Sequence, residues 1–232
     1  MMKSIDTNID NWLLYSVLGR EILSKERQFY SNNIDKLFGI YSLQIGLPEI
    51  NVFQGNKIVN HYHIGVDIFC SGRYLPFTDN SIDLIIMPHY LEQHNDYKYV
   101  LNEVTRILTP NGVLIISCFN SQSLLNLRRK SQRRLDKVNF INLSELKSNL
   151  INNKLSIIGG KFFSYCPPFH KASRLKKYNF LNKIGDRWLP TFANSYALIC
   201  RKNITNINSI KLKPNLRNIN PELRTVNKCQ NN

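Results

Sequence analysis

Several features of membrane and secreted proteins are missing from this 232-residue sequence. No apolar run approaches the roughly 20 residues that a membrane-spanning helix needs. The start of the chain holds no basic segment followed by an apolar one, so we expect no signal peptide. The five cysteines are odd in number and widely spaced, and none forms a Cys-x-x-Cys pair. We therefore expect reduced thiols, no zinc site, no transmembrane segment and a cytoplasmic protein.

Acidic residues are scarce. The chain has 31 Lys and Arg against 16 Asp and Glu, a formal net charge of +15. A polyanionic partner, such as nucleic acid or an anionic membrane surface, would account for this excess. Compositional bias would account for it equally, because Asn, Lys and Ile are all frequent. The charge is clustered between residues 128 and 137, which predicts either a solvated loop or a polyanion contact through Arg128, Arg129, Arg133 and Arg134.

The clearest local pattern lies in the middle of the chain. Asp83 to Met87 is a short apolar run, as expected of a strand buried on both faces. Tyr97 to Leu108 carries the apolar stripe of an amphipathic helix. Thr109 to Gly112 reads Thr-Pro-Asn-Gly, which stops that helix. Val113 to Ser117 is a second apolar strand, so the segment predicts a right-handed parallel βαβ unit.

This segment resembles a known family. The letters L-P-F-x-D-x-S-I-D before the first strand and L-N-E-V-x-R-I-L-T-P-N-G before the second are similar to class I S-adenosylmethionine (SAM)-dependent methyltransferases of the type 11 kind. The resemblance covers residues 71–120, and the run F-N-x-x-S-L-x-x-L-R-R is similar to a divergent bacterial subgroup. It implies an α/β fold with a Rossmann-like sheet, SAM as the cofactor, and methyl transfer by in-line displacement to an unidentified acceptor.

The cofactor signature of that family is degenerate in this chain. Its glycine-rich turn follows the first strand, which we place at Ile40 to Gly46. Gly46 matches a motif glycine, Gln44 stands where an acid is expected, and Pro48 removes a backbone donor. By family position, the residues implied to contact the cofactor are Gln44, Gly46, Asp67, Ser71, Gly72 and Met87.

The first half of the fold is also short. A βαβ unit takes roughly 30 residues or more, so Ile40 to Cys70 holds one crossover at best, and Asn51 to Val59 suggests a β-hairpin. In one alignment Asp67 ends the second strand, where its carboxylate would hold ribose hydroxyls. In the other, His63 to Phe69 is the third strand and Ser71 stands where an adenine-contacting Asp is found. The second is preferred because it preserves the spacing to the L-P-F turn.

The loop after the Asp83–Met87 strand holds the candidate catalytic residues. In the family this loop lines the methyl-transfer centre at the carboxyl edge of the sheet. His89, Glu92 and His94 are therefore candidates for a general base or a substrate contact. A base is needed only where the acceptor must lose a proton, and each of the three would otherwise be an exposed loop side chain. The histidine spacing alone does not indicate a metal site.

The remaining segments complete an expected division of the chain at residues 38 and 202. Residues 1–38 are predicted to form a helical extension with two apolar stripes, the second capped by Asn32 or Asn33. Residues 39–202 form the α/β domain, with a last strand at Ser195 to Cys200 that the resemblance implies is antiparallel. Residues 203–232 are polar, basic and without periodicity, which predicts a disordered tail.

Three functions remain open from the sequence, and the third, an RNA- or ribosome-associated protein, rests only on charge and could coexist with either of the other two. The first is a SAM-dependent methyltransferase, which rests on the central segment. The second is a degenerate methyltransferase fold that has lost SAM binding and acts as a basic module for nucleic acid or protein. It rests on the glycines and acids that the cofactor turn lacks.

Overall fold

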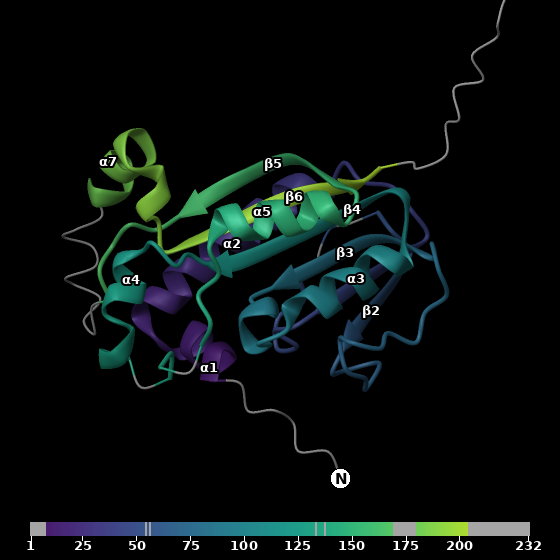
Figure 1. The fold of residues 1–232 in the computed structure, drawn as a ribbon, viewed down its shortest axis with the longest axis horizontal. Helices are drawn as coiled ribbons and strands as arrows, with labels where there is room; N and C mark the ends of the chain where they lie inside the picture. The colour runs from purple at the N-terminus through teal and green to yellow at the C-terminus, as the bar shows by residue number, and fades with distance from the viewer. Residues whose placement is uncertain are drawn as a thin grey trace, which may run out of the picture.

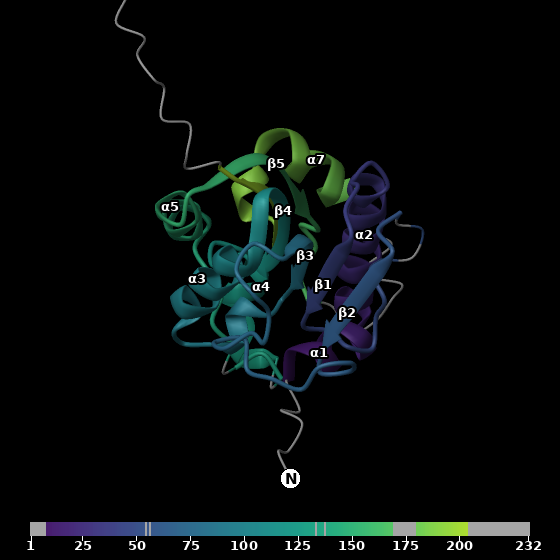
Figure 2. The same cartoon turned by 90° about the vertical axis from the view of Figure 1, so that its right-hand side faces the viewer.

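A computed structural model describes residues 8–53, 55, 57–132, 134–136, 138–168 and 180–203. Six strands of this part form one mixed sheet in the order β2-β1-β3-β4-β6-β5. Helices cover both faces of the sheet (Figures 1 and 2). The predicted α/β architecture is confirmed.

The strands alternate with helices along most of the chain. The strands are β1 (Tyr41–Ile45), β2 (Asn60–Ile64), β3 (Ile82–Pro88), β4 (Leu108–Phe119), β5 (Leu155–Phe163) and β6 (Ser195–Lys202). The helices are α1 (Asn8–Tyr15), α2 (Val17–Ile34), α3 (Tyr97–Ile107), α4 (Leu124–Leu127), α5 (Leu143–Asn152) and α7 (Phe180–Trp188). Short 3-10 turns are η1 (Leu91–Gln93), η2 (Arg129–Ser131) and η3 (Pro190–Phe192).

Strand direction divides the sheet into two parts. Strands β2, β1, β3 and β4 are parallel to one another. Strand β6 is antiparallel to β4, and β5 is antiparallel to β6. The predicted βαβ unit is β3, α3 and β4, and the predicted antiparallel last strand is β6. Because β3 and β4 run side by side, their carboxyl ends meet at one edge of the sheet.

The first half of the sheet is trimmed, as predicted. Among the described residues between β1 and β3, β2 is the one strand of the sheet, and it pairs directly with β1 from Tyr41↔Asn60 to Ile45↔Ile64. Strand β2 therefore takes the place beside the first strand. The preferred assignment of His63 to Phe69 as a third strand is wrong, because no strand of the described chain lies between β1 and β2. Asp67 follows the strand at the second-strand position.

The expected hairpin at Asn51 to Val59 is also wrong. The described residues of this segment hold no strand and no helix. Val52, Phe53 and Ile58 are buried in the core instead. Their side chains pack beneath α1 and α2, so burial of apolar surface rather than strand pairing fixes this loop.

The break between the first two helices lies at Ser16, far ahead of the predicted position. Ser16 has an extended backbone, and its side chain accepts a hydrogen bond from the Gly19 amide, which caps α2. Asn32 and Asn33 lie inside α2, and the Asn33 amide donates to the Phe29 carbonyl. The prediction of a second helix that starts at these asparagines is therefore wrong.

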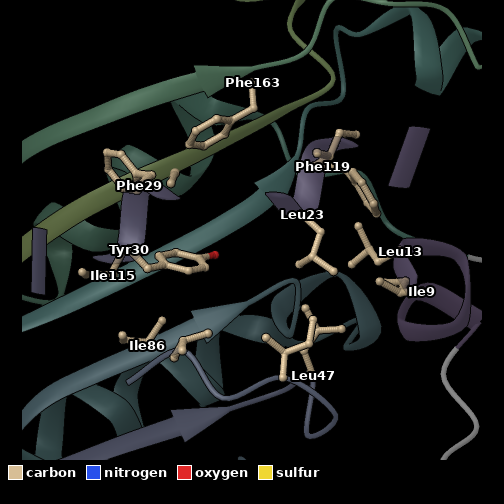
Figure 3. Close-up of a cluster of buried hydrophobic side chains, with 14 of the residues drawn as sticks. Ile9, Leu13, Leu23, Phe29, Tyr30, Leu47, Ile86, Ile115, Phe119 and Phe163 are labelled. Carbon is tan, nitrogen blue, oxygen red and sulfur yellow. The ribbon is translucent and has the colours of Figure 1, made fainter. Parts of the chain in front are cut away.

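Two hydrophobic clusters pack on opposite faces of the sheet. Alternate residues of the strands contribute to each: Leu84 and Ile86 face one cluster, while Ile85 and Met87 face the other. The first cluster is closed by α1, α2 and the loop after β1 (Figure 3). The second is closed by α3 and α5. Helix α2 thus packs on the face to which β3, β4, β5 and β6 contribute buried side chains.

Two residues of the family-like motif tie the L-P-F turn to α3. The Leu75 amide donates to Glu103 Oε2 over 3.1 Å. Arg106 donates to the carbonyl oxygens of Leu75 and Phe77 over 3.1 and 2.9 Å, and to Glu103 itself. The Glu and Arg of this motif therefore have a structural role, which is to hold the loop that leads into β3.

Candidate functional site

The candidate site lies where the parallel strands end. Gly46 follows β1, Asp67 follows β2, and His89 follows β3. This is the edge at which open α/β sheets bind ligands.

Gln44 has its polar atoms committed to the loop after β1. Its side chain is buried, and its amide donates to the carbonyl oxygens of Gly46, Leu47 and Ile50 over 2.7–3.0 Å. Its carbonyl oxygen accepts from the Val52 amide over 3.3 Å. Gln44 therefore shapes the turn from below and presents no polar atom to a ligand above it.

Tyr90 lies between two glycines. A Cβ atom at Gly46 would come within 3.2 and 3.3 Å of Tyr90 Cβ and Cδ2, and a Cβ at Gly72 within 2.6 Å of its hydroxyl oxygen. The Gly72 amide donates to that hydroxyl oxygen over 3.1 Å. Gly46 also has a positive φ of 98°, which favours glycine. The two glycines thus border a slot that fits one aromatic ring, which we call the glycine slot.

The other residues implied to contact the cofactor have mixed surroundings. Asp67 is exposed, and its Oδ2 accepts from the His63 amide over 2.8 Å. The Ser71 hydroxyl accepts from the Arg73 amide over 3.3 Å. The Met87 side chain is fully buried in the cluster beneath α3. Asp67 is therefore the acid of this set that solvent can reach, while Met87 lies in the core.

His89 is the centre of a buried ion cluster, which we call the Glu26–His89–Glu92 cluster. His89 Nδ1 lies 2.9 Å from Glu92 Oε1, and Nε2 lies 3.1 Å from both carboxylate oxygens of Glu26. All three side chains are buried, with at most 1% of the surface of each residue exposed. The cluster joins α2, the end of β3 and η1.

Further hydrogen bonds connect the cluster to the later strands. The Ser195 hydroxyl donates to Glu26 Oε1 over 2.7 Å, and the Phe119 amide donates to Glu92 Oε1 over 2.7 Å. Beside it, the Tyr30 hydroxyl is hydrogen-bonded to Ser117. Buried carboxylates need such donors, because an unpaired buried charge is strongly destabilising.

The carboxylates keep His89 charged. Burial by itself would lower its pKa, but the negative charges of Glu26 and Glu92 and their hydrogen bonds outweigh burial and raise the pKa to about 10. An imidazolium therefore sits between two carboxylates at neutral pH. With both ring nitrogens bonded and no exposed surface, His89 holds elements together in this structure, and its role as a general base stays a prediction.

His94 lies nearer the surface than the cluster. Its ring is tilted against that of Tyr90, with centroids 4.6 Å apart. Burial lowers its pKa, and the positive charge of Arg73 lowers it further. Within the described residues its Nε2 has no hydrogen-bond partner. Of the three candidate catalytic residues, His94 is the one whose pKa is lowered and whose Nε2, although buried, has no partner among the described residues.

Sequence reasoning missed two residues of this region, Glu26 and Tyr90. Glu26 lies one turn after Ile22 and one turn before Tyr30, in the apolar stripe of α2. A charged residue at such a position must find a buried partner, which is the signal that could have singled it out. Tyr90 gave no sequence signal, because its neighbours Gly46 and Gly72 are remote in the chain.

The basic loop is partly used inside the molecule. Arg129 donates to the Val138 carbonyl over 2.9 Å and lies over the ring of Phe140, and Arg134 donates to the Asn11 carbonyl over 3.3 Å. Arg133 lies outside the described residues. Contact of this loop with a polyanion stays a prediction.

Two absences hold for the described part of the chain. No group of three or more His, Cys, Asp or Glu side chains is arranged to hold a metal ion there. No helix in that part is long and apolar enough to cross a membrane.

The glycine slot is the part of the site that fits a nucleoside cofactor. It accepts a planar ring, and the Gly72 amide offers that ring a hydrogen bond. The turn after β1 fits less well, because no helix begins among its described residues 46–53, 55 and 57–59, and the amides of Ile50, Val52 and Phe53 are used within the loop. The arrangement therefore suits the ring of a nucleoside better than it suits a charged group at the β1 turn.

Part of this chain is similar to known proteins. Residues 53–116 match the model of the methyltransferase domain family. The uncharacterized protein YafS of Escherichia coli K12 is 32% identical over 100 residues, which cover 40% of this chain and 42% of that protein. The chain matches less than half of the length of the curated relatives.

Solved structures share the fold at low sequence identity. The cyclase SpnF is 14% identical with a TM-score of 0.58, over 85% of this chain and 93% of that one. A SAM-dependent methyltransferase from Archaeoglobus fulgidus is 16% identical with a TM-score of 0.53, over 79% and 94%. Residues 53–116 are therefore similar to a methyltransferase domain, and the chain shares the fold of solved class I SAM-dependent methyltransferases.

Proposed function

We propose that the protein is a SAM-dependent methyltransferase that transfers a methyl group by in-line displacement to an acceptor of unknown class. The observation that carries this proposal is the glycine slot, where two glycines leave room for one ring, now that of Tyr90, beside a backbone donor at the carboxyl edge of a methyltransferase-like fold. SAM would supply an electrophilic methyl group on its sulfonium sulfur.

The residues that would hold SAM come from three loops. Gly46 and Gly72 would border its ring, and the exposed carboxylate of Asp67 would accept hydrogen bonds from ribose hydroxyls. His94 would be the base if the acceptor must lose a proton, because burial and Arg73 keep its imidazole neutral. For an acceptor that is already a neutral nucleophile, alignment alone would suffice.

The test is titration calorimetry with SAM and with its demethylated product, S-adenosylhomocysteine. Micromolar binding of either ligand, weakened by Asp67→Asn, is the expected result. A matched control is Asp35→Asn, which alters an exposed acid at the end of α2. Absence of binding at millimolar ligand would contradict the proposal.

A second candidate is a degenerate fold without SAM binding that acts as a basic module. The commitment of Gln44 to the β1 loop and the lack of a helix in the described part of that loop favour it. Its test is retention on heparin after Arg→Gln changes at Arg128, Arg129, Arg133 and Arg134. The control removes equal charge from four exposed lysines: Lys36, Lys57, Lys98 and Lys147.

The two heparin variants give distinct outcomes. Weaker retention of the arginine variant than of the lysine variant would support a polyanion contact at the basic loop, and its salt dependence would become shallower. Equal retention of the two variants would mean that net charge alone attracts heparin, and the loop would then be solvated surface.

A further inference from the structure

The side chain of Tyr90 fills the glycine slot, which is the space that the ring of a bound ligand would need. Its Cβ and Cδ2 edge lies against Gly46, and its hydroxyl end lies against Gly72. Neither glycine could be replaced without a clash, since an added Cβ would lie 2.9 Å from the Pro88 carbonyl oxygen at one end and 2.6 Å from the phenol oxygen at the other. The slot and the ring therefore match in both size and length.

The polar contact inside the slot also has the character of a ligand contact. The Gly72 amide donates to the phenol oxygen over 3.1 Å. An acceptor nitrogen at the edge of a purine ring could take the same hydrogen bond. Burial raises the pKa of the Tyr90 hydroxyl, so it stays neutral across the physiological range, as a purine nitrogen does.

The backbone on either side aims Tyr90 at the slot. His89 has a left-handed backbone with φ of 48°, which is unfavourable for a residue with a side chain. Its side chain is bonded to Glu26 and Glu92, and its amide donates to the Ser117 carbonyl over 2.9 Å. The 3-10 turn η1 follows directly. The buried cluster thus holds the strained residue that directs the tyrosine.

We propose that Tyr90 is an internal stand-in for the ring of a purine nucleoside, and that it must leave the glycine slot before such a ligand binds. The proposal rests on the proposed function, because SAM is a purine nucleoside ligand of this kind. The structure is then the closed state of the site. The apparent affinity for the ligand is reduced by the fraction of molecules in which the slot is open.

The proposal predicts how Tyr90 substitutions change ligand affinity. Tyr90→Ala removes the ring, so we expect S-adenosylhomocysteine to bind about tenfold or more tightly than it binds the wild-type protein. Tyr90→Phe keeps the ring but loses the hydrogen bond to Gly72, so its affinity should lie between the two. Tyr15→Ala is the control, because Tyr15 is an exposed tyrosine at the end of α1, and its affinity should equal that of the wild-type protein.

A second measurement follows the slot without any ligand. The Gly72 amide should exchange its hydrogen slowly in the wild-type protein and faster in Tyr90→Phe, because the phenol oxygen is its acceptor. Equal exchange in the two proteins would overturn the placement of Tyr90. Thermal melts of each variant show whether it is folded before either result is used.

The outcomes separate this proposal from the proposed function. Tighter binding by Tyr90→Ala supports both. Equal or weaker binding by Tyr90→Ala, with clear binding by the wild-type protein, overturns the stand-in and leaves the methyltransferase. Absence of binding by every protein, with Tyr90→Ala folded, overturns both.

Discussion

The two halves of the parallel sheet, β1 with β2 and β3 with β4, each hold two neighbouring parallel strands, but the strands are connected differently. In the second half, β3 and β4 are joined by α3, which packs on the sheet that it connects. In the first half, the described residues between β1 and β2 hold no helix, and buried residues of the loop after β1 pack together with α1 and α2 instead. The cover of a sheet face therefore need not come from the crossover that joins its strands.

The halves also differ in how they handle charge. Arg106 in the second half is 32% exposed and bonds to Glu103 and Asp79 near the surface. Glu26, in the helix α2 that precedes the first half, is fully buried and reaches His89 at the end of β3. Solvent can replace some of the contacts of Arg106, whereas it cannot reach those of Glu26. The ion pairs of Arg106 and of Glu26 should therefore stabilise the folded protein by different amounts.

The largest effect is expected from Glu26→Ala. This change leaves a buried imidazolium with a single carboxylate partner and leaves the Ser195 hydroxyl without its acceptor. The free energy of unfolding should fall by about 3–5 kcal/mol, measured by urea denaturation. Asp35→Asn, an exposed acid at the end of the same helix, should change it by less than about 0.5 kcal/mol. Similar losses of unfolding free energy from the two changes would mean that the burial of Glu26 does not make it more important for stability than an exposed acid.

The pH dependence of stability should report the same cluster. The pKa of His89 is raised from its ordinary value of 6.5 to about 10, so the folded state binds a proton that the unfolded state releases. Its contribution to stability is fully present below pH 6.5 and is lost as the pH rises through about 10. Between these values the free energy of unfolding should fall by up to about 1.4 kcal/mol per pH unit.

The useful window for this measurement is pH 6.5 to 8.5. The buried Cys118 and the buried tyrosines Tyr30 and Tyr196, whose pKa values are also raised by burial, release protons in the unfolded state mainly above about pH 8, so the lower part of the window reports His89 most cleanly. Urea denaturation at several pH values in the window should show the fall in wild-type protein and a flatter profile in His89→Gln. An equal slope in the two proteins would assign the pH dependence to other groups.

A smaller effect is expected in the second half. Arg106→Ala removes the hydrogen bonds that hold the L-P-F turn to α3. The loss should be about 1–3 kcal/mol, because Arg106 is partly exposed and water replaces some of its partners. Lys98→Ala, at an exposed position of α3, is the control and should have little effect. A loss of stability from Arg106→Ala as large as that from Glu26→Ala would mean that solvent exposure does not determine how much these charged residues stabilise the fold.

The smallest effect is expected from truncation after Asn203. The Lys202 ammonium donates to Asn80 and to the carbonyl oxygens of Thr105 and Leu108, and the Asn203 amide donates to the Lys154 carbonyl. These contacts fasten the end of β6 without residues 204–232. The melting temperature should therefore stay nearly unchanged in a thermal scan, and a fall of many degrees would show that those residues contribute to the fold.

The sequence predicted the second half better than the first for a physical reason. Val100, Leu101, Val104 and Ile107 repeat with the helical period, and the strands that flank this helix are short apolar runs. Such patterns state which face is buried, so β3, α3 and β4 could be predicted. They do not predict which element packs against a face. The packing of α2 on the sheet could therefore not be predicted, and the break ahead of this helix at Ser16 was missed.

The candidate site was predicted in position but only partly in composition. Gly46, Asp67, Gly72 and His89 all lie at the carboxyl edge, as the resemblance implied. Burial of His89 was not foreseen, because it depends on Glu26, which is 63 positions away. Tyr90 was missed because its ring packs against the backbone of Gly46 and Gly72, two residues that have no side chain. Neither kind of contact leaves a periodic signal.

The hydrogen bond between Ser195 and Glu26 sets an order of events during synthesis. It joins residues 169 positions apart, and β6, the last described strand, lies between β4 and β5. Helix α2 leaves the ribosome long before β6, yet its Glu26 carboxylate has no hydroxyl donor, and β5 has no neighbour in the sheet, until β6 has been made. Folding dominated by such distant contacts is slow. The sheet is therefore completed only when β6 is present, and a nascent chain that stops before β6 would leave Glu26 paired with His89 but without its hydroxyl donor.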